Sequence, residues 1–451
     1  MKLPIPNPFH NQVHRPRDKA LGVAELIAIA LGGMVGGGIF TILGISVAMV
    51  GVYTPLVIAV GGVIATFAAY SYVKLGVYYR DEGATYSFFC RTFPRSQFAA
   101  SLIGWWVIFG YISTLALYAY TFASYAISGF AFADSDWVRK AVACGIILVF
   151  ALINVWSVRG MGKIEDLMVY SKLVILAIIS FVLINNSTTT LPVLWQASEG
   201  GAEQASLLSM MMLAALTFVA YEGFQLVINA VNEMERPERN IPLAIYSAMG
   251  LATLIYVVIA LGAILAIPFD DIIQNQEYAL AAGAGKVLGH WGTELVIVGA
   301  LLATSSAISG TVFGASRQMA VIARDGYFPA LLAHRNNRIP TFAILAMAFL
   351  AMALVVSGGL VVILEFASFT FLLVSILMAW ANFRLRDKTA SSTSVTLISL
   401  AVLVMGLVLI IVYEASHQPE QLYFIFGLYL LLTLGAWFYA ARKQRQTGAT
   451  R

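Results

Sequence analysis

The chain contains 451 residues, of which 60% are hydrophobic and only 11% are charged. Ordinary soluble domains carry roughly 25% charged residues, so this composition excludes a soluble globular protein and indicates a membrane protein. The formal net charge of +4 does not point to a nucleic-acid partner, and we expect none. The two cysteines, Cys90 and Cys144, do not predict a disulfide framework.

Twelve apolar stretches are close to or longer than the roughly 20 residues that cross the hydrocarbon core, and each predicts a transmembrane helix. They are 22–48, 54–75, 97–129, 138–157, 164–186, 206–233, 241–267, 290–318, 341–356, 361–383, 392–413 and 420–441. The polar, proline-rich residues 1–20 predict a cytoplasmic tail rather than a cleavable signal. Because the number of spans is even, both termini lie on the same side of the membrane.

Most lysine and arginine residues fall in loops on one side of the expected membrane. That side carries Lys2, Arg15, Arg17, Lys19, Arg80, Arg91, Arg95, Arg159, Lys163, Arg236, Arg239, Arg317, Arg324, Arg335, Arg338, Arg384, Arg386 and Lys388. On the opposite side we count only Arg139, Lys140 and Lys286. Because such residues favour cytoplasmic loops, the sequence predicts a multi-pass protein of the plasma (inner) membrane with both termini in the cytoplasm.

The first span contains LGGMVGGGIF, residues 31–40, with five glycines inside an apolar run. Glycine disfavours a helix by about 1 kcal/mol relative to alanine and lets two backbones approach closely. The pairs Gly32/Gly36 and Gly33/Gly37 have the small-xxx-small spacing of a helix-packing seam. A break in the helix is the alternative, and in hydrocarbon it needs a cavity, an ion or a ligand to take up the freed backbone groups.

The sixth span reads LTFVAYEGFQLVINAVNEMERPERNIP and places Glu222 and Gly223 near its middle. A carboxylate at that depth costs about 3 kcal/mol, so it usually faces a cavity or a partner. Two interrupted helices five spans apart are typical of inverted-repeat transporters. The sequence therefore predicts an all-α membrane protein with a LeuT-like 5+5 inverted-repeat core, broken helices 1 and 6, and two peripheral helices. The expected divisions are repeats at 21–186 and 187–388, peripheral helices at 389–441 and a cytoplasmic tail at 442–451.

Three separated motifs resemble the amino acid-polyamine-organocation (APC) superfamily of transporters. GGMVGGGIF resembles the glycine signature of its first helix, and YEGF followed by NEMERPERNIP resembles its sixth helix and the following loop. SGTVFGASRQMAVIARDGYFP resembles its eighth helix and cytoplasmic loop. The motifs occur in the family's order, and the similarity is nearest to the prokaryotic amino acid permeases.

The resemblance implies that backbone groups at the two breaks bind an amino acid. The carboxylate is expected at three backbone amides, those of Gly36, Gly37 and Gly38. The ammonium group is expected at four backbone carbonyls, those of Met34, Val219, Ala220 and Glu222. This arrangement gives the anion and the cation of a zwitterion the matching ends of two broken helices.

An aromatic gate often occupies the position that aligns with Val219, so its place here is expected to be taken by Phe218 or Tyr221. The role of Glu222 stays open at this point. Its carboxyl can favour cationic substrates, tune proton affinity or form a local hydrogen bond.

Lys172 lies in the apolar run MVYSKLVILAII of the fifth span, nine residues after Lys163. This spacing places it roughly 13 Å into a hydrocarbon core about 30 Å thick. A side chain that snorkels to the interface is one reading. The resemblance implies another, because proton-coupled members hold a lysine where sodium-coupled relatives of the fold hold an ion. Its ammonium would then bridge carbonyls near Gly32 and Gly33 to the hydroxyls of Ser305, Ser306 and Ser309.

The sequence thus predicts a secondary active transporter that imports amino acids by alternating access, with proton-coupled symport. An amino acid exchanger without ion coupling is the alternative. The five histidines fall at span ends, in loops or in the tail, and no convergent nucleophile is evident. We therefore expect no enzymatic activity, no cofactor and no metal; the expected partners are the amino acid substrate, protons and the lipid bilayer.

Overall fold

The computed structural model describes residues 21–81, 83–156, 158–194, 206–231, 234–336 and 339–448. The expected N-terminal tail at 1–20 and the last three residues of the C-terminal tail lie outside these described residues. Within them the chain is helical, with no strand beyond two isolated bridges, Leu21 with Met234 and Asn336 with Ile339.

The elements follow one another as a series of long helices with short connections. In chain order they are α1 (Val23–Met34), α2 (Gly38–Val50), η1 (Gly51–Tyr53), α3 (Thr54–Tyr79), α4 (Ala84–Thr92), α5 (Gln97–Ile127), α6 (Asp136–Trp156), α7 (Val158–Asn185), α9 (Leu207–Leu216), η2 (Thr217–Tyr221), α10 (Leu226–Asn229), α11 (Pro237–Ala266), α12 (Phe269–Gln274), α13 (Ala279–Leu288), α14 (His290–Arg324), η4 (Ala330–Ala333), α15 (Thr341–Ser357), α16 (Leu360–Arg384), α17 (Thr393–His417) and α18 (Pro419–Gly448).

Ten helical segments in the described part of the chain are long and apolar enough to cross a membrane. The difference from the expected twelve has two sources. The segment Gly38–Tyr79 runs through η1 without interruption and so joins half of the first expected span to the second. The ninth expected span is the shorter apolar helix α15, and α1 is likewise short because it stops inside the first span.

Local sequence accounts for where several helices begin. The hydroxyl of Ser96 accepts a hydrogen bond from the amide of Ala99 at 3.2 Å, which caps the first turn of α5. Helices α3 and α11 carry Pro55 and Pro237 in their first turn, where the missing proline N–H costs nothing.

Both helix breaks are present in the structure. Helix α1 ends at Met34, residues 35–37 are not helical, and α2 starts at Gly38. In the sixth span α9 gives way to the 3₁₀ turn η2, and residues 222–225 form a turn before the four-residue α10. Gly223 has φ of +121°, a conformation that residues with a side chain rarely adopt.

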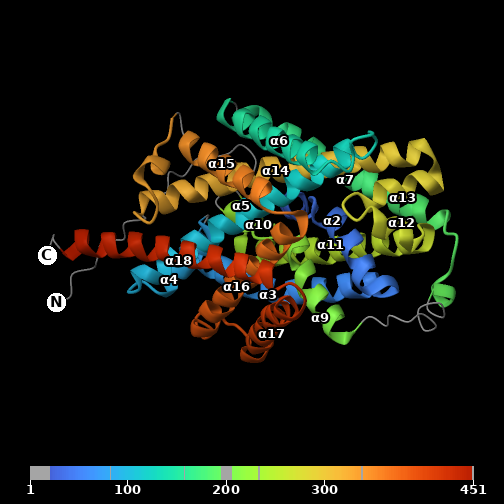
Figure 1. Cartoon of the computed structure of the whole chain (residues 1–451). Helices are drawn as coiled ribbons and strands as arrows, with labels where there is room; N and C mark the ends of the chain where they lie inside the picture. The colour runs from blue at the N-terminus through green and yellow to red at the C-terminus, as the bar shows by residue number, and fades with distance from the viewer. Residues whose placement is uncertain are drawn as a thin grey trace.

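Helix α5 lies at the centre of the bundle and packs against α6, α14, α16 and α18 (Figure 1). In its most apolar stretch 72% of the residues are buried, compared with 28% in α17 and α18. Figure 1 also shows α6 and α17 on opposite outer edges of the bundle. The last two helices are therefore peripheral and expose apolar side chains such as Val408 and Trp437 on their outer faces.

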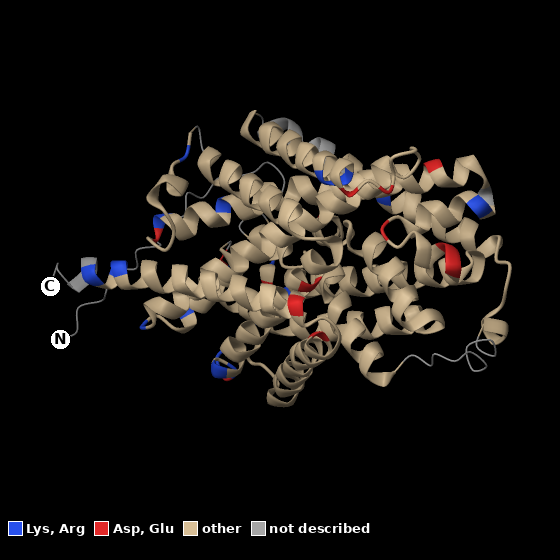
Figure 2. Ribbon diagram, viewed as in Figure 1, with Lys and Arg blue, Asp and Glu red and all other residues tan. Residues whose placement is uncertain are grey.

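Most lysine and arginine residues lie toward the two ends of the bundle, whereas acidic residues also occur in its middle (Figure 2). At one end Lys443 of α18 donates to the carbonyl of Asp325 at 2.6 Å, and Tyr86 donates to the Asp325 carboxylate at 2.9 Å. At the other end Arg139 forms an ion pair of 2.6 Å with Glu277. We call the end that contains Asp325 and the C-terminal ends of α3 and α14 the cation-rich end.

A substitution at Gly61 would test how α3 packs against the broken sixth span. A Cβ atom at Gly61 would lie 3.0 Å from the carbonyl oxygen of Ala214 and would overlap the Thr217 hydroxyl. We expect Gly61→Val to lower the unfolding temperature in detergent by several degrees, because overpacking costs about 1–3 kcal/mol. Gly250→Val in α11 is the matched control, since no atom lies within 4 Å of its added Cβ. Equal unfolding temperatures for the two variants would contradict this packing.

Candidate functional site

The two helix breaks meet backbone to backbone. A Cβ atom built on Gly33 would lie 3.1 Å from Cα of Gly223, and one built on Gly38 would lie 2.8 Å from Cα of Ala220. Both separations are too short for a methyl group to fit without movement of the neighbouring backbone. The helix is therefore broken here, and Gly33 and Gly38 pack closely on either side of the break. Gly36 and Gly37 lie outside α1, so the pairs Gly32/Gly36 and Gly33/Gly37 do not form a seam on one continuous helix.

Tyr256 of α11 links the two breaks. Its hydroxyl lies 2.8 Å from the carbonyl oxygen of Met34 and 2.9 Å from that of Ala220, and it donates to these two acceptors. A phenol has one hydrogen, so the two carbonyls share it. Two of the four carbonyl oxygens expected to receive the substrate's ammonium group, those of Met34 and Ala220, are therefore neighbours in space.

Lys172 of α7 is fully buried beside the first break. Its ammonium group donates to the carbonyl of Gly32 at 2.8 Å, to the carbonyl of Val35 at 2.6 Å and to the hydroxyl of Ser306 at 2.9 Å. This geometry rules out the snorkelling reading, because the side chain points into the bundle. It ties the C-terminal end of α1 to α14.

The three serines expected around Lys172 differ in their surroundings. Ser306 accepts from the ammonium group, whereas the buried Ser309 hydroxyl has no hydrogen-bond partner among the described residues. Ser305 is half-buried. Gly33, expected near Lys172, packs against Gly223, whereas the Lys172 ammonium group donates to the carbonyls of Gly32 and Val35.

Glu222 is buried at the turn of the sixth span and belongs to a short polar network. Gln225 donates to one Glu222 carboxylate oxygen at 2.6 Å and to the Tyr111 hydroxyl at 3.2 Å. The side-chain carbonyl of Gln225 accepts from the amide of Gly223 at 3.1 Å, which holds the turn. The second carboxylate oxygen of Glu222 is buried and has no hydrogen-bond partner among the described residues.

The amides expected to bind the carboxylate stand in a tightly packed region. The Gly36 amide donates to the Met34 carbonyl at 2.9 Å inside the break. Gly38 is the first residue of α2, so the amides of this turn lack partners within the helix. A Cβ atom at Gly37 would lie 3.0 Å from the Thr121 hydroxyl oxygen and 3.2 Å from Thr304. Any side chain at this position would therefore crowd these two threonines.

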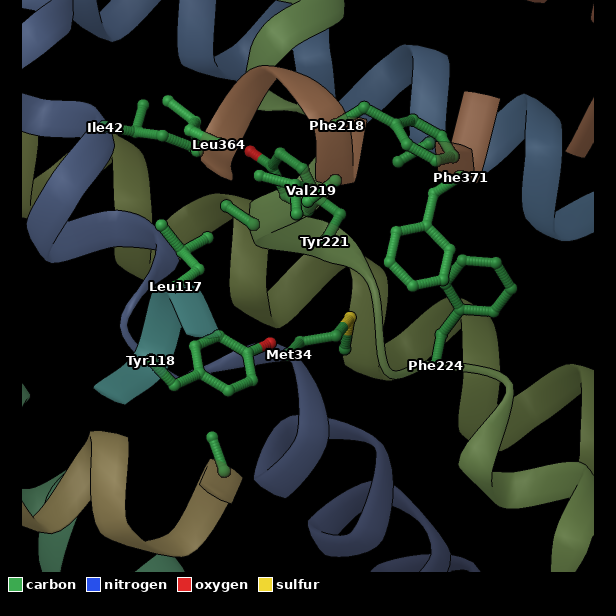
Figure 3. Close-up of a cluster of buried hydrophobic side chains, with 14 of the residues drawn as sticks. Met34, Ile42, Leu117, Tyr118, Phe218, Val219, Tyr221, Phe224, Leu364 and Phe371 are labelled. Carbon is green, nitrogen blue, oxygen red and sulfur yellow. The ribbon is translucent and has the colours of Figure 1, made fainter. Parts of the chain in front are cut away.

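The residues considered for the gate are buried and point in different directions. Tyr221 donates from its hydroxyl to the carbonyl of Ile58 at 2.8 Å, which fixes its ring against α3. In Figure 3 the Tyr118 side chain points toward Met34, whereas Phe218 points away from both. Tyr118 thus joins Tyr256 as an aromatic side chain beside the first break.

A narrow cavity of about 30 Å³ adjoins the breaks and has room for a few water molecules. It is lined near the breaks by Gly32, Tyr118, Glu222 and Ser306 and farther on by Gly314 and Gln318 of α14. From Ser306 to Gln318 it follows α14 for roughly 18 Å. The cavity therefore extends from the two breaks toward the cation-rich end.

Sequence reasoning did not identify Tyr256, Tyr118, Tyr111 or Gln225 as site residues. One signal was available, since a tyrosine hydroxyl buried in a long apolar helix requires a hydrogen-bond partner. That rule applies to the many tyrosines of this chain alike and does not say which of them face the breaks.

Comparisons with known proteins show the family to which the chain belongs. A model of the amino acid permease family matches residues 21–441. The chain is 28% identical over 415 residues to the inner membrane transport protein YbaT of Escherichia coli (strain K12), a match that covers 92% of this chain and 95% of YbaT. It is 25% identical over 394 residues to cationic amino acid transporter 4 of Homo sapiens, covering 83% of this chain and 61% of the human protein. The chain therefore belongs to the amino acid permease family, within the amino acid-polyamine-organocation superfamily of transporters.

Proposed function

We propose that this protein is a secondary active transporter that imports amino acids by alternating access and couples import to proton symport. Membership of the amino acid permease family supports amino acid transport. The observation that carries the coupling is the buried Lys172 ammonium group, which joins the broken first span to α14. A titratable cation in this position ties proton binding to the relative position of two helices.

The architecture that we propose is twelve spans with a LeuT-like 5+5 inverted-repeat core. In this scheme α1 and α2 form the first span, and α9, η2 and α10 form the sixth. Two interruptions five spans apart support the repeat, because an odd number of spans inverts the second repeat relative to the first. The peripheral helices are then α17 and α18.

The substrate's charged groups would bind at the ends of the broken helices. The N-terminal end of α2, with the amides of Gly36, Gly37 and Gly38, suits the carboxylate. The carbonyls of Met34, Val219, Ala220 and Glu222 suit the ammonium group. In this proposal the ammonium takes over the contacts that the Tyr256 hydroxyl makes to Met34 and Ala220.

We propose that the cation-rich end faces the cytoplasm of a cell whose plasma (inner) membrane holds the protein. The excess of lysine and arginine at this end supports the orientation, which also puts both termini in the cytoplasm. The cavity along α14 is then the cytoplasmic route to the site.

The proposed proton mechanism follows from the number of N–H donors that the Lys172 side chain has in its charged and neutral forms. An ammonium group has three N–H donors, and the acceptors of Lys172 include the carbonyls of Gly32 and Val35 and the hydroxyl of Ser306. A neutral amine has two donors and no net charge, so it binds the carbonyls of Gly32 and Val35 less strongly. Loss of the proton would loosen the link between α1 and α14 and allow the two parts to move.

The first experiment is uptake of a panel of labelled amino acids into proteoliposomes, with and without an inward pH gradient and without sodium. Proton symport predicts accumulation above equilibrium only when the gradient is present. Exchange without net accumulation would instead support an antiporter, and a sodium requirement would contradict the proton mechanism.

Lys172→Ala should abolish proton-driven accumulation in the same assay, because the cation no longer links α1 to α14. Lys172→Arg should also fail to accumulate substrate, since guanidinium stays charged at any accessible pH. Counterflow exchange checks that each variant still binds and moves substrate. Lys140→Ala, which removes a cation paired with Asp136 at the opposite end, is the control. If the alanine variant concentrates substrate like the wild type, Lys172 is not the coupling residue.

Gly37→Val should abolish saturable substrate binding while leaving the protein folded. The branched side chain would fill the space beside Thr121 and Thr304 and oppose the non-helical backbone. Gly250→Val provides the control for the same change on an open helix face. Scintillation proximity binding reports the affinity, and thermal unfolding reports the fold. Wild-type affinity in Gly37→Val would exclude these amides as the carboxylate site.

Glu222→Gln should change the pH profile of uptake or the preference between cationic and neutral amino acids by roughly fivefold, the effect of about 1 kcal/mol. The amide keeps the shape of the side chain but removes the charge that its unpartnered oxygen presents. Uptake rates measured at several pH values with one cationic and one neutral substrate test this. Unchanged profiles would leave Glu222 with a purely structural role at the turn.

A further inference from the structure

A second, larger pocket lies away from the helix breaks, at the cation-rich end of the bundle. It has a volume of about 680 Å³ and is formed by the last turns of α3, the first turns of α11 and the turn between α16 and α17. Its polar lining includes Tyr70, Lys74, Arg80, Glu238, Tyr246 and Lys388. We call it the basic pocket.

The basic pocket carries an excess of positive charge. Arg80 lies 3.4 Å from Glu238, and both side chains are about half exposed, so water screens this pair. Lys74 donates to the carbonyl of Ala390 at 2.8 Å, which uses one of its three N–H groups and orients the ammonium toward the turn. Lys388 is exposed. Three cations and one carboxylate therefore leave two positive charges without a counter-ion in the pocket lining.

The pocket continues into an exposed apolar surface. On α3 the lining residues Tyr70, Lys74 and Val77 follow one another at intervals of three or four, which places them on one face of the helix. The same face carries Val63, Val60 and Leu56, which are 54%, 42% and 57% exposed.

Helix α11 repeats this arrangement. Tyr246 lines the pocket, and one and two turns beyond it lie the exposed positions Gly250 and Leu254. Because α3 and α11 pack together, the two apolar faces form one surface that leads from the basic pocket toward the middle of the bundle.

We propose that the basic pocket binds the phosphate of an anionic phospholipid headgroup, with the acyl chains along the exposed faces of α3 and α11. Basic pockets between membrane helices bind anionic headgroups, and the apolar faces offer the chains a surface that free phosphate would not use. A zwitterionic lipid brings its own cation toward Lys388 and is therefore disfavoured. Among the described residues of the opposite end, Lys140 and Lys286 are each paired with an aspartate, and Arg139 is paired with Glu277.

Native mass spectrometry of the purified full chain tests this site by titration with phosphatidylglycerol, with phosphatidylcholine of the same acyl chains and with inorganic phosphate. We expect one phosphatidylglycerol to bind more tightly than either alternative. The double variant Lys74→Ala/Lys388→Ala should weaken that binding roughly 25-fold, about fivefold for each lysine. The double variant Lys140→Ala/Lys286→Ala removes two cations at the other end and should bind as the wild type does.

Lys388→Glu gives a second test that does not depend on a buried side chain, because Lys388 is exposed and its replacement leaves the fold intact. It should weaken phosphatidylglycerol binding by about tenfold or more, since it reverses a charge. Equal binding of phosphatidylcholine, or an equal loss in the control double variant, would overturn the proposal. Competition by inorganic phosphate at matched concentration would assign the pocket to free phosphate and overturn the lipid assignment.

Discussion

The central site depends on the contact between two backbones at the points where their helices are interrupted. Gly33 against Gly223 and Gly38 against Ala220 are so close that a side chain on either glycine would separate the breaks. This crossing requires residues without side chains, and it removes backbone carbonyls from helical hydrogen bonding. In the middle of a membrane no water replaces those bonds, so other protein groups must supply the donors. Because the glycine contacts leave these carbonyls without helical hydrogen bonds, polar side chains must lie near them in the middle of the membrane.

Two side chains from different helices supply these donors, and they differ in chemistry. Tyr256 of α11 offers one hydrogen to two carbonyls, those of Met34 and Ala220, and so links the breaks to each other. Lys172 of α7 offers three hydrogens and links the first break to α14 through Ser306. A ligand with its own ammonium group competes with the phenol for the same carbonyls. In the proposed mechanism, protonation of Lys172 sets how strongly its side chain binds the carbonyls of Gly32 and Val35. Substrate and proton would then act on the same non-helical segment through different side chains.

Part of this arrangement could be predicted from the sequence. Glycines in an apolar run and a carboxyl group at mid-span identified both breaks, because each feature is costly in a helix surrounded by lipid. Lys172 was expected near Gly32 and Ser306, and both contacts are present, while its coupling role stays a prediction. Tyr256 could not be singled out. Core-facing and lipid-facing sides of a membrane helix are both apolar, so hydropathy does not show which face of α11 points inward.

The two sides of the breaks are built differently, and this difference bears on transport. Beside Gly37 the space is narrow, because Thr121 and Thr304 would lie 3.0 and 3.2 Å from an added Cβ atom. Along α14 the small residues Gly310 and Gly314 keep a narrow cavity open toward the cation-rich end. In the proposed alternating-access cycle, the side of the site that is open must close and the side that is closed must open. Helix α14 lines the cavity and also contacts Lys172 through Ser306. In the proposed mechanism, movement at this contact would therefore change the cavity and the link between α1 and α14 together.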